Sequence, residues 1–267
     1  MKRVLGLVVL GIALALPGYC AAVLFKTTDQ SDLWWIPSES GWGIQIVQQE
    51  STIFATMFVY GPNKQPTWYV ALLNDPTFGD FTWTGTLYAT TGPWFGTVPF
   101  DPAATTASAV GTMTFQGQQI NVATLTYTVN GVQVVKQIQR ETLVTIDFSN
   151  SYSGVLSQAG VAGSCPPAAI TDATPATFRI TQSGASMRIN SSSQVGTCTF
   201  DGTYSQSGHF GRVAGNYTCL NGDAGTFKFF EMAASQYDVR ARTQLVSQSG
   251  CTLNGYVSGL VQPPPAQ

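Results

Sequence analysis

The residues best suited to chemistry are concentrated in one short stretch, DLWWIPSESGWG, at positions 32–43. It combines one glutamate with three tryptophans: Glu39, Trp34, Trp35 and Trp42. Glycoside hydrolysis needs two carboxyl groups roughly 5–10 Å apart, beside a surface on which a sugar ring can stack. Asp32 and Glu50 are acids close enough in sequence to act with Glu39. This stretch therefore suggests a glycosidase-like hydrolase centred on Glu39.

The same residues also suit a binding surface without catalysis. Tryptophan has a large apolar ring and a polar edge, which lets it stack on a sugar while still in contact with water. Adjacent residues of an extended segment point to opposite faces, so we expect one of Trp34 and Trp35 to be buried and the other exposed. A ligand site would then consist of Glu39 and one of these two rings.

The sequence lacks the residues that other catalytic mechanisms need. His209 is the only histidine, so a Ser-His-Asp or Cys-His mechanism would have to use it. Its position between Gly208 and Phe210 predicts an exposed turn, which is a poor place for a preorganised base. The sequence has no G-x-S-x-G elbow, no phosphate-binding glycine loop and no zinc ligand set. We therefore expect no cofactor and no metal, and we favour a protein without catalytic activity.

Charge is sparse, at 10% of residues against roughly 25% in an average soluble domain. The formal net charge is −2, and no basic run is present that could neutralise phosphates. We therefore do not expect nucleic acid or anionic membrane surfaces as partners. A polysaccharide or another envelope protein is the expected kind of partner. The isolated Glu231 lies in an apolar run and is expected to pair with Arg240 or Arg242.

The N-terminus has the order of a secretory signal peptide. Two basic residues precede an apolar run at 4–16 that is too short to span a bilayer, and small residues follow it. We expect a signal peptide at 1–22, cleaved after Ala22, and a mature protein that is periplasmic or secreted and has no transmembrane segment. Lipidation of Cys20 is the alternative, which the bulky Tyr19 disfavours.

Cysteines support export as well. Four remain after such cleavage: Cys165, Cys198, Cys219 and Cys251. An even number in an exported chain predicts two disulfides. If Gln206 pairs with His209 across a turn, Cys198 faces Tyr217, and one bulge would bring it to Cys219. We favour Cys198–Cys219 and Cys165–Cys251, and the other pairings stay open.

Composition divides the chain into two parts. All six tryptophans precede residue 95, and all four mature cysteines follow residue 164. Residues 23–148 carry four basic and nine acidic residues, a charge of −5, whereas residues 149–267 carry six and five, a charge of +1. We expect a Trp-rich antiparallel domain at 23–148, a disulfide-containing β domain at 149–261 and a Pro-rich disordered tail at 262–267.

Both parts are predicted to be antiparallel β. The first contains about eight runs rich in β-branched and aromatic residues, without helical periodicity. Asn130-Gly131 lies between two alternating runs and predicts a type I′ hairpin. In the second part, [ST]-Q-[AS]-G recurs as an expected hairpin turn at 157–160, 181–184, 205–208 and 247–250. The predicted fold is an antiparallel barrel or closed sandwich, followed by a second, disulfide-linked antiparallel β domain.

Trp42, between Gly41 and Gly43, also suggests an architectural role. Small calycin-type barrels begin with a glycine-tryptophan pair whose ring closes one end of the barrel, under an arginine from the last strand. Arg140 lies near the end of the eighth predicted run, and stacking on a ring would contribute ~0.5–2 kcal/mol. We assign structural roles to Trp42 and Arg140 on this analogy of fold, which carries no function.

The pattern W-x-P-x-E-S-G-W-G, with F-A-x-x-F-x-Y and P-x-W-Y-V after it, resembles a family of exported proteobacterial proteins. The matching residues are Trp35, Pro37, Glu39–Gly43, Phe54–Tyr60 and Pro66–Val70. The similarity covers residues 32–145 and implies an exported bacterial β domain, but no particular activity. We therefore predict a non-catalytic binding or surface-interaction protein, which in its most concrete form binds glycans through Trp34, Trp35 and Glu39. A hydrolase using Glu39 and a purely structural envelope protein are the alternatives.

Overall fold

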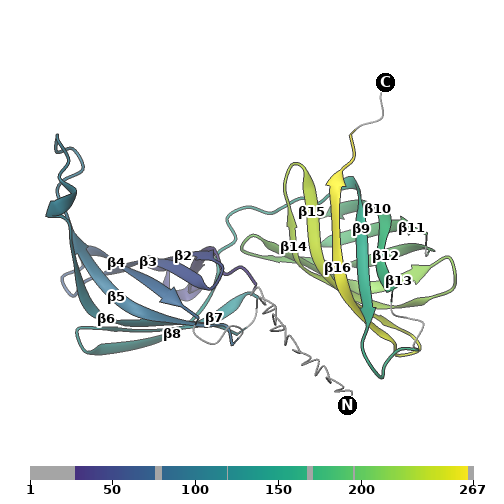
Figure 1. Ribbon diagram of the computed structural model, residues 1–267, viewed down its shortest axis with the longest axis horizontal. Helices are drawn as coiled ribbons and strands as arrows, with labels where there is room; N and C mark the ends of the chain where they lie inside the picture. Colours follow the sequence, from purple (N-terminus) through teal and green to yellow (C-terminus); the bar gives the residue numbers. More distant parts are fainter. Residues whose placement is uncertain (1–27, 76–79, 119, 167–170, 195, 264–267) are drawn as a thin grey trace, which may run out of the picture.

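The computed structural model describes residues 28–75, 80–118, 120–166, 171–194 and 196–263. The signal peptide expected at 1–22, with Cys20, lies outside these residues, as do positions 264–267 of the expected tail. Within the described residues the chain forms two closed antiparallel barrels of eight strands each (Figure 1). A linker at 141–149 joins them. The prediction of an all-β chain with two antiparallel domains is confirmed.

The first barrel follows the chain order and closes by pairing its first strand with its last. Its elements are β1 (Asp32–Trp35), η1 (Pro37–Glu39), β2 (Gly43–Gln49), β3 (Thr52–Tyr60), β4 (Pro66–Asn74), β5 (Thr82–Thr91), η2 (Pro102–Ala104), β6 (Thr106–Gly117), β7 (Val122–Val129) and β8 (Val132–Arg140). Strand β1 pairs with both β2 and β8, where Trp34 lies opposite Arg140. The long connection at 92–105 projects away from the barrel (Figure 1).

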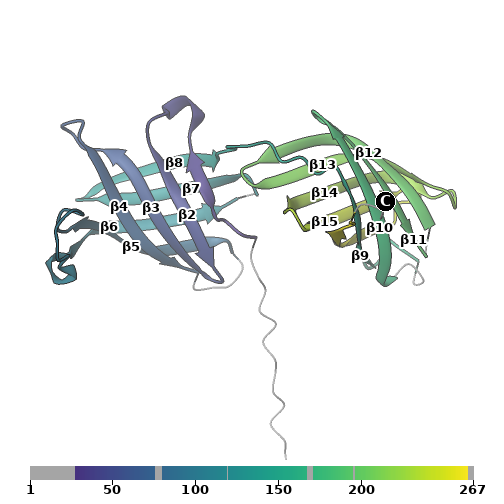
Figure 2. The same cartoon turned by 90° about the horizontal axis from the view of Figure 1, so that it is seen from above.

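The second barrel repeats this plan, with its first strand again closing onto its last (Figure 1). Figure 2 shows the two barrels from above. Its strands are β9 (Asn150–Gly160), β10 (Thr171–Ser183), β11 (Ser186–Ser193), β12 (Gly196–Ser207), β13 (Phe210–Cys219), β14 (Ala224–Ala234), β15 (Asp238–Ser247) and β16 (Thr252–Val261). Strand β9 lies between β10 and β16.

Side chains fill the interior of both barrels. Alternate residues of each strand point inward, and the largest that are fully buried in the first barrel include Trp34, Trp83 and Phe115. The rings of Trp34 and Phe115 meet edge to face, with centroids 5.1 Å apart. In the second barrel, Phe200 meets Phe227 in the same way at 5.1 Å. A space of about 10 Å³ among Phe178, Phe229 and Val257 in that core has room for about one water molecule, too little for a ligand.

The backbone φ angles and the strand pairing bear on two turn predictions. Asn130 and Gly131 have φ angles of 48° and 84° and join Val129 to Val132, which confirms the type I′ hairpin. Three copies of [ST]-Q-[AS]-G also form turns, and each ends in a glycine with positive φ: Gly184, Gly208 and Gly250. The turn expected at 157–160 was wrong, because this segment belongs to β9 and pairs with β16 to close the barrel.

Both favoured disulfides are present: Cys198–Cys219 and Cys165–Cys251. The register expected around the first was wrong. Ser207, not Gln206, begins the turn and pairs with Phe210. This shift places Cys198 directly opposite Cys219, so no bulge is needed.

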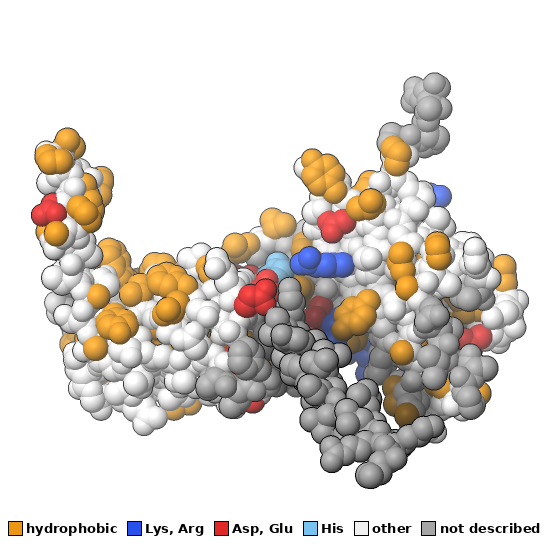
Figure 3. All heavy atoms as spheres, viewed as in Figure 1, with side chains coloured by type: hydrophobic (Ala, Val, Ile, Leu, Met, Phe, Trp, Pro, Cys, Tyr) orange, Lys and Arg blue, Asp and Glu red, His pale blue; other side chains and the backbone are white. Residues whose placement is uncertain are grey.

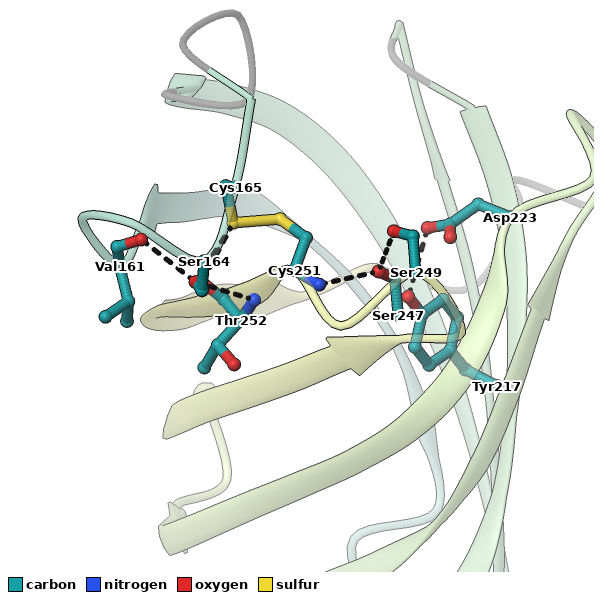
Figure 4. The surroundings of a disulfide bond; sticks show 9 residues. All are labelled: Val161, Ser164, Cys165, Tyr217, Asp223, Ser247, Ser249, Cys251 and Thr252. Atoms are coloured by element: carbon teal, nitrogen blue, oxygen red, sulfur yellow. Dashed lines mark hydrogen bonds between the residues drawn. A yellow bond between two sulfur atoms is a disulfide. The ribbon is translucent and has the colours of Figure 1, made fainter.

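The second disulfide ties the segment after β9 to the start of β16 (Figure 4). Ser164 supports it from the neighbouring position. The Ser164 hydroxyl donates to the Val161 carbonyl at 2.9 Å and accepts from the Thr252 N–H at 3.2 Å. Cys165 and Cys251 therefore join two turns that already share hydrogen bonds.

Candidate functional site

Arg140 lies at the contact between the two barrels, and its side chain is fully buried. Its guanidinium carbon lies 4.6 Å from the Trp34 ring centre in the first barrel and 5.2 Å from the Phe210 ring centre in the second. A guanidinium between two aromatic faces is attracted by both rings. The expected arginine stack is present, but on Trp34 instead of Trp42, which is partly buried and packs against the core of the first barrel. Trp34 is in register with Arg140 across β1 and β8, whereas Trp42 precedes β2 and has the Lys136 ammonium 5.7 Å from its ring.

One carboxylate and several backbone carbonyls satisfy the Arg140 guanidinium. Nη1 donates to Asp32 Oδ2 at 2.9 Å and to the Ser31 carbonyl at 3.2 Å, and Nη2 donates to the Asp29 carbonyl at 2.7 Å. Nε donates to the Ile120 carbonyl. Burial lowers the pKa of Arg140, which the Asp32 carboxylate opposes. The rigid fork of donors thus fixes the segment before β1 and the loop between β6 and β7.

Asp32 also binds the second barrel. Its Oδ2 accepts the His209 backbone N–H at 3.2 Å and lies 2.8 Å from His209 Nδ1. Burial raises the pKa of the Asp32 carboxyl, but the hydrogen bonds from His209 and Arg140 outweigh it, and the net pKa is below the usual value. The sequence predicted an exposed turn for His209. Its side chain is partly exposed, but the contact with Asp32 was missed because nothing local in the sequence indicates it.

Two glutamines from the recurring turns hold the linker against one end of the second barrel. Gln206 accepts the Ile146 N–H at 2.9 Å and donates to the Val144 carbonyl at 2.8 Å. Gln182 accepts the Phe148 N–H at 3.1 Å and donates to the Ile146 carbonyl at 3.2 Å. Phe148 itself is fully buried in the core of that barrel. The linker therefore packs as part of the second barrel.

Glu39 does not meet the acids proposed to act with it. Its carboxylate accepts Lys136 Nζ at 2.7 Å and Trp42 Nε1 at 3.0 Å, and these bonds lower its pKa. Glu50 follows the other end of the seven-residue strand β2, which places it about 20 Å away. The Asp32 carboxylate is engaged at the barrel junction. The arrangement does not assemble the paired carboxyl groups that glycoside hydrolysis needs.

The two adjacent tryptophans have different environments, as expected from their alternation. Trp34 is fully buried, and its Nε1 donates to the Gln30 carbonyl at 3.0 Å. A ring inside the core cannot stack on a ligand, so the binding role predicted for Trp34 is corrected to a structural one. Trp35 is partly exposed, and it stays a candidate together with Glu39.

An apolar surface covers the outside of β2, β3 and β4. Its side chains point away from the core, and each is between 43% and 58% exposed: Val47, Phe54, Phe58, Trp68 and Leu72. Phe54 pairs with Leu72 and Phe58 with Trp68, so these residues are direct neighbours. The three strands contain no charged residue. We call these five residues the apolar face.

The connection between β5 and β6 carries more exposed apolar side chains. Four of them are between 53% and 92% exposed: Trp94, Phe95, Val98 and Phe100. Trp68 Nε1 donates to Thr90 Oγ1 at 2.9 Å, just before this connection begins, so it adjoins the apolar face. Figure 3 shows hydrophobic side chains over both regions. We call residues 92–105 the finger.

No protein-family model matches this chain, and no curated protein matches it either. The resemblance to exported proteobacterial proteins therefore stays a prediction. In the part of the chain that the structure describes, no helix is long and apolar enough to cross a membrane. The same residues contain no group of three or more His, Cys, Asp or Glu side chains placed to hold a metal ion.

Proposed function

We propose that this is an exported, non-catalytic binding protein that docks onto another envelope protein through its apolar face and finger. The observation that carries this proposal is the exposure of nine large apolar side chains on one barrel whose core is already filled. Contiguous apolar patches of this kind mark interaction sites, because leaving them in water is unfavourable. The two disulfides support export, and the signal peptide expected at 1–22 would provide its route.

The composition of this surface favours a protein partner. The centres of protein interfaces are depleted in charge and enriched in aromatic residues, and β2, β3 and β4 carry no charge. Aliphatic residues are interspersed with the rings, as with Leu72 beside Phe54. A sugar gains little from an aliphatic neighbour, whereas a protein core buries one at roughly 25 cal/mol per Å².

Glycan binding by ring stacking is the second candidate function. The rings best placed for it are Trp68 and Phe58, which the sequence did not indicate. Trp68 and Phe58 lie opposite each other in register, and both rings are exposed. The hydrogen bond from Trp68 Nε1 to Thr90 fixes the orientation of the indole. Two neighbouring rings could accommodate two sugar units, with Trp35 and Glu39 as a separate site on the same barrel.

Sedimentation of the mature protein with isolated envelopes tests the proposal. We expect binding that falls at least about tenfold in Phe58→Ser/Trp68→Ser, because aromatic residues at the centre of an interface dominate its energy. Gln116→Ser, a change at an exposed position on β6, is the control and should bind normally. Equal binding of the double variant and the wild type would exclude the apolar face.

Treating the envelopes with protease before the assay separates the two candidates. A protein partner predicts that binding is lost, and a glycan partner predicts that it survives. In the second case, a polysaccharide panel should quench tryptophan fluorescence in the wild type and not in Trp68→Ser.

A further inference from the structure

A cleft of about 540 Å³ lies where the second barrel meets the first. Ile120 and Asn121, between β6 and β7, form one wall. The other wall consists of outward-facing residues of the second barrel, among them Arg212, Lys228 and Phe230. Figure 3 shows basic and acidic side chains close together at this junction. Ligand sites commonly have volumes of roughly 300–1,000 Å³ and lie between domains.

Two cations in this cleft lack a carboxylate partner among the described residues. Arg212 and Lys228 project from the neighbouring strands β13 and β14, and both are exposed. Arg242, which lines the adjoining groove on the second barrel, pairs with Glu231 at 3.1 Å, and Glu231 also accepts the Thr28 hydroxyl at 2.8 Å. The pairing of Glu231 with Arg242 was one of the two expected from the sequence. The charged residues that line the cleft are therefore two cations, Arg212 and Lys228, and one carboxylate, Glu231, which is already paired with Arg242.

The cleft continues onto the outside of the second barrel. Phe230 also lines a groove of about 340 Å³ over β9, β15 and β16. The Arg242 guanidinium carbon lies 4.9 Å from the Phe230 ring centre, and Tyr256 pairs opposite Arg242. The amides of Gln244 and Asn254 lie beside these rings, 3.1 Å from each other. Aromatic faces, amides and cations thus alternate along one extended surface.

The backbone at Glu231 is shaped for this surface. Its φ of +52° lies in the left-handed region, which residues other than glycine rarely adopt. The pairing of β14 with both neighbouring strands shifts at this point. Bulges of this kind redirect side chains and concentrate near functional sites. Here the bulge directs the Glu231 carboxylate toward Arg242, which is thereby held over Phe230.

We propose that the cleft and groove bind an acidic oligosaccharide, a sugar chain that bears carboxylate groups. Arg212 and Lys228 contact its carboxylates, Phe230 lies under a sugar ring, and Gln244 bonds its hydroxyls. A nucleic acid fits less well, because residues 23–148 carry a charge of −5 and repel a chain of phosphates. This site lies mainly on the second barrel and is independent of the apolar face.

Calorimetric titration of the mature, disulfide-bonded protein with a galacturonic acid tetramer tests the proposal. We expect saturable binding that weakens as salt is added, and no binding of maltotetraose, a neutral chain of equal length. Arg212→Gln/Lys228→Gln should bind the acidic tetramer at least about tenfold more weakly, and Arg212→Gln alone about threefold more weakly. Arg179→Gln, which removes an exposed cation from β10, is the matched control and should bind like the wild type.

No binding of the acidic tetramer, equal binding of the neutral one, or full binding by the double variant would each overturn the proposal. Tighter binding of a tetranucleotide would overturn it in favour of nucleic acid. Both side chains are exposed, so thermal unfolding of the variants should match that of the wild type. If the double variant did not fold, the single variant and the comparison of acidic with neutral chain would still decide.

Discussion

Asp32 of the first barrel and His209 of the second meet across the barrel junction, with Oδ2 2.8 Å from Nδ1. The same carboxylate oxygen accepts Arg140 Nη1 at 2.9 Å. The pKa of Asp32 is lowered in the folded protein. Its bonds therefore add stability that is fully present above the unfolded-state pKa of about 3.9 and is lost as the pH falls through the lower folded-state value.

We expect Asp32→Asn to reduce the free energy of unfolding by about 2 kcal/mol near neutral pH, because it removes the charge opposite the buried Arg140. The difference from the wild type should shrink below about pH 4, as the carboxyl is protonated first in the unfolded chain and then, at lower pH, in the folded protein. Urea unfolding across this range measures both. Asp201→Asn, which breaks the exposed pair with Arg188, should change stability by less than about 0.5 kcal/mol. A difference that does not vary with pH would contradict the account.

Arg140→Lys should also destabilise the protein, by about 2–3 kcal/mol. The lysine ammonium cannot make the hydrogen bonds that the planar guanidinium donates in several directions. It also stacks less well between Trp34 and Phe210. Arg188→Lys, at an exposed ion pair, provides the matched control. Thermal unfolding of the two variants compares them, and similar melting temperatures would show that the junction does not depend on the guanidinium.

Gln206→Ala should loosen the linker without unfolding the second barrel. It removes the partner of the Ile146 N–H and of the Val144 carbonyl, at a cost of about 1 kcal/mol, because water can reach these groups. Amide hydrogen exchange should accelerate at residues 144–148 and change little in β2–β4. The control is Gln116→Ala at an exposed position on β6, for which we expect no change in the linker.

The two disulfides should contribute unequally to the free energy of unfolding. They close segments of 86 and 21 residues, for which loop entropy predicts about 4.6 and about 3.3 kcal/mol. Replacing Cys165 and Cys251 by serine should therefore lower stability by about 1 kcal/mol more than replacing Cys198 and Cys219. Denaturant unfolding of the two double variants measures the difference, and the opposite order would indicate strain or residual structure in the unfolded chain.

Features that depend on local chemistry could be predicted from the sequence. The Asn130-Gly131 hairpin follows from the φ angles that its turn requires. The Cys198–Cys219 pairing follows from two strands that flank a turn, which leaves Cys165 with Cys251. How the first barrel closes was harder to predict from the sequence, because β1 has only four residues and shows no clear periodicity. The glycines that flank Trp42 suggested that its ring lies under Arg140, whereas the ring in that position is Trp34.

Features that depend on how distant parts meet could not be predicted. Asp32 and His209 are 177 residues apart and belong to different barrels. The apolar face was hidden for another reason. In β3, Ile53 and Met57 point inward while Phe54 and Phe58 point outward, so both alternations are apolar and neither identifies the solvent side.

Site-specific photo-crosslinking in intact cells tests the central claim, docking through the apolar face, most directly. A photoreactive phenylalanine analogue would replace Phe58, Trp68 or Phe95, with Gln116 on β6 as the control position. We predict that the three apolar positions yield the same discrete protein adduct and that position 116 yields none. Adducts absent from all three, or equally strong at position 116, would contradict the claim.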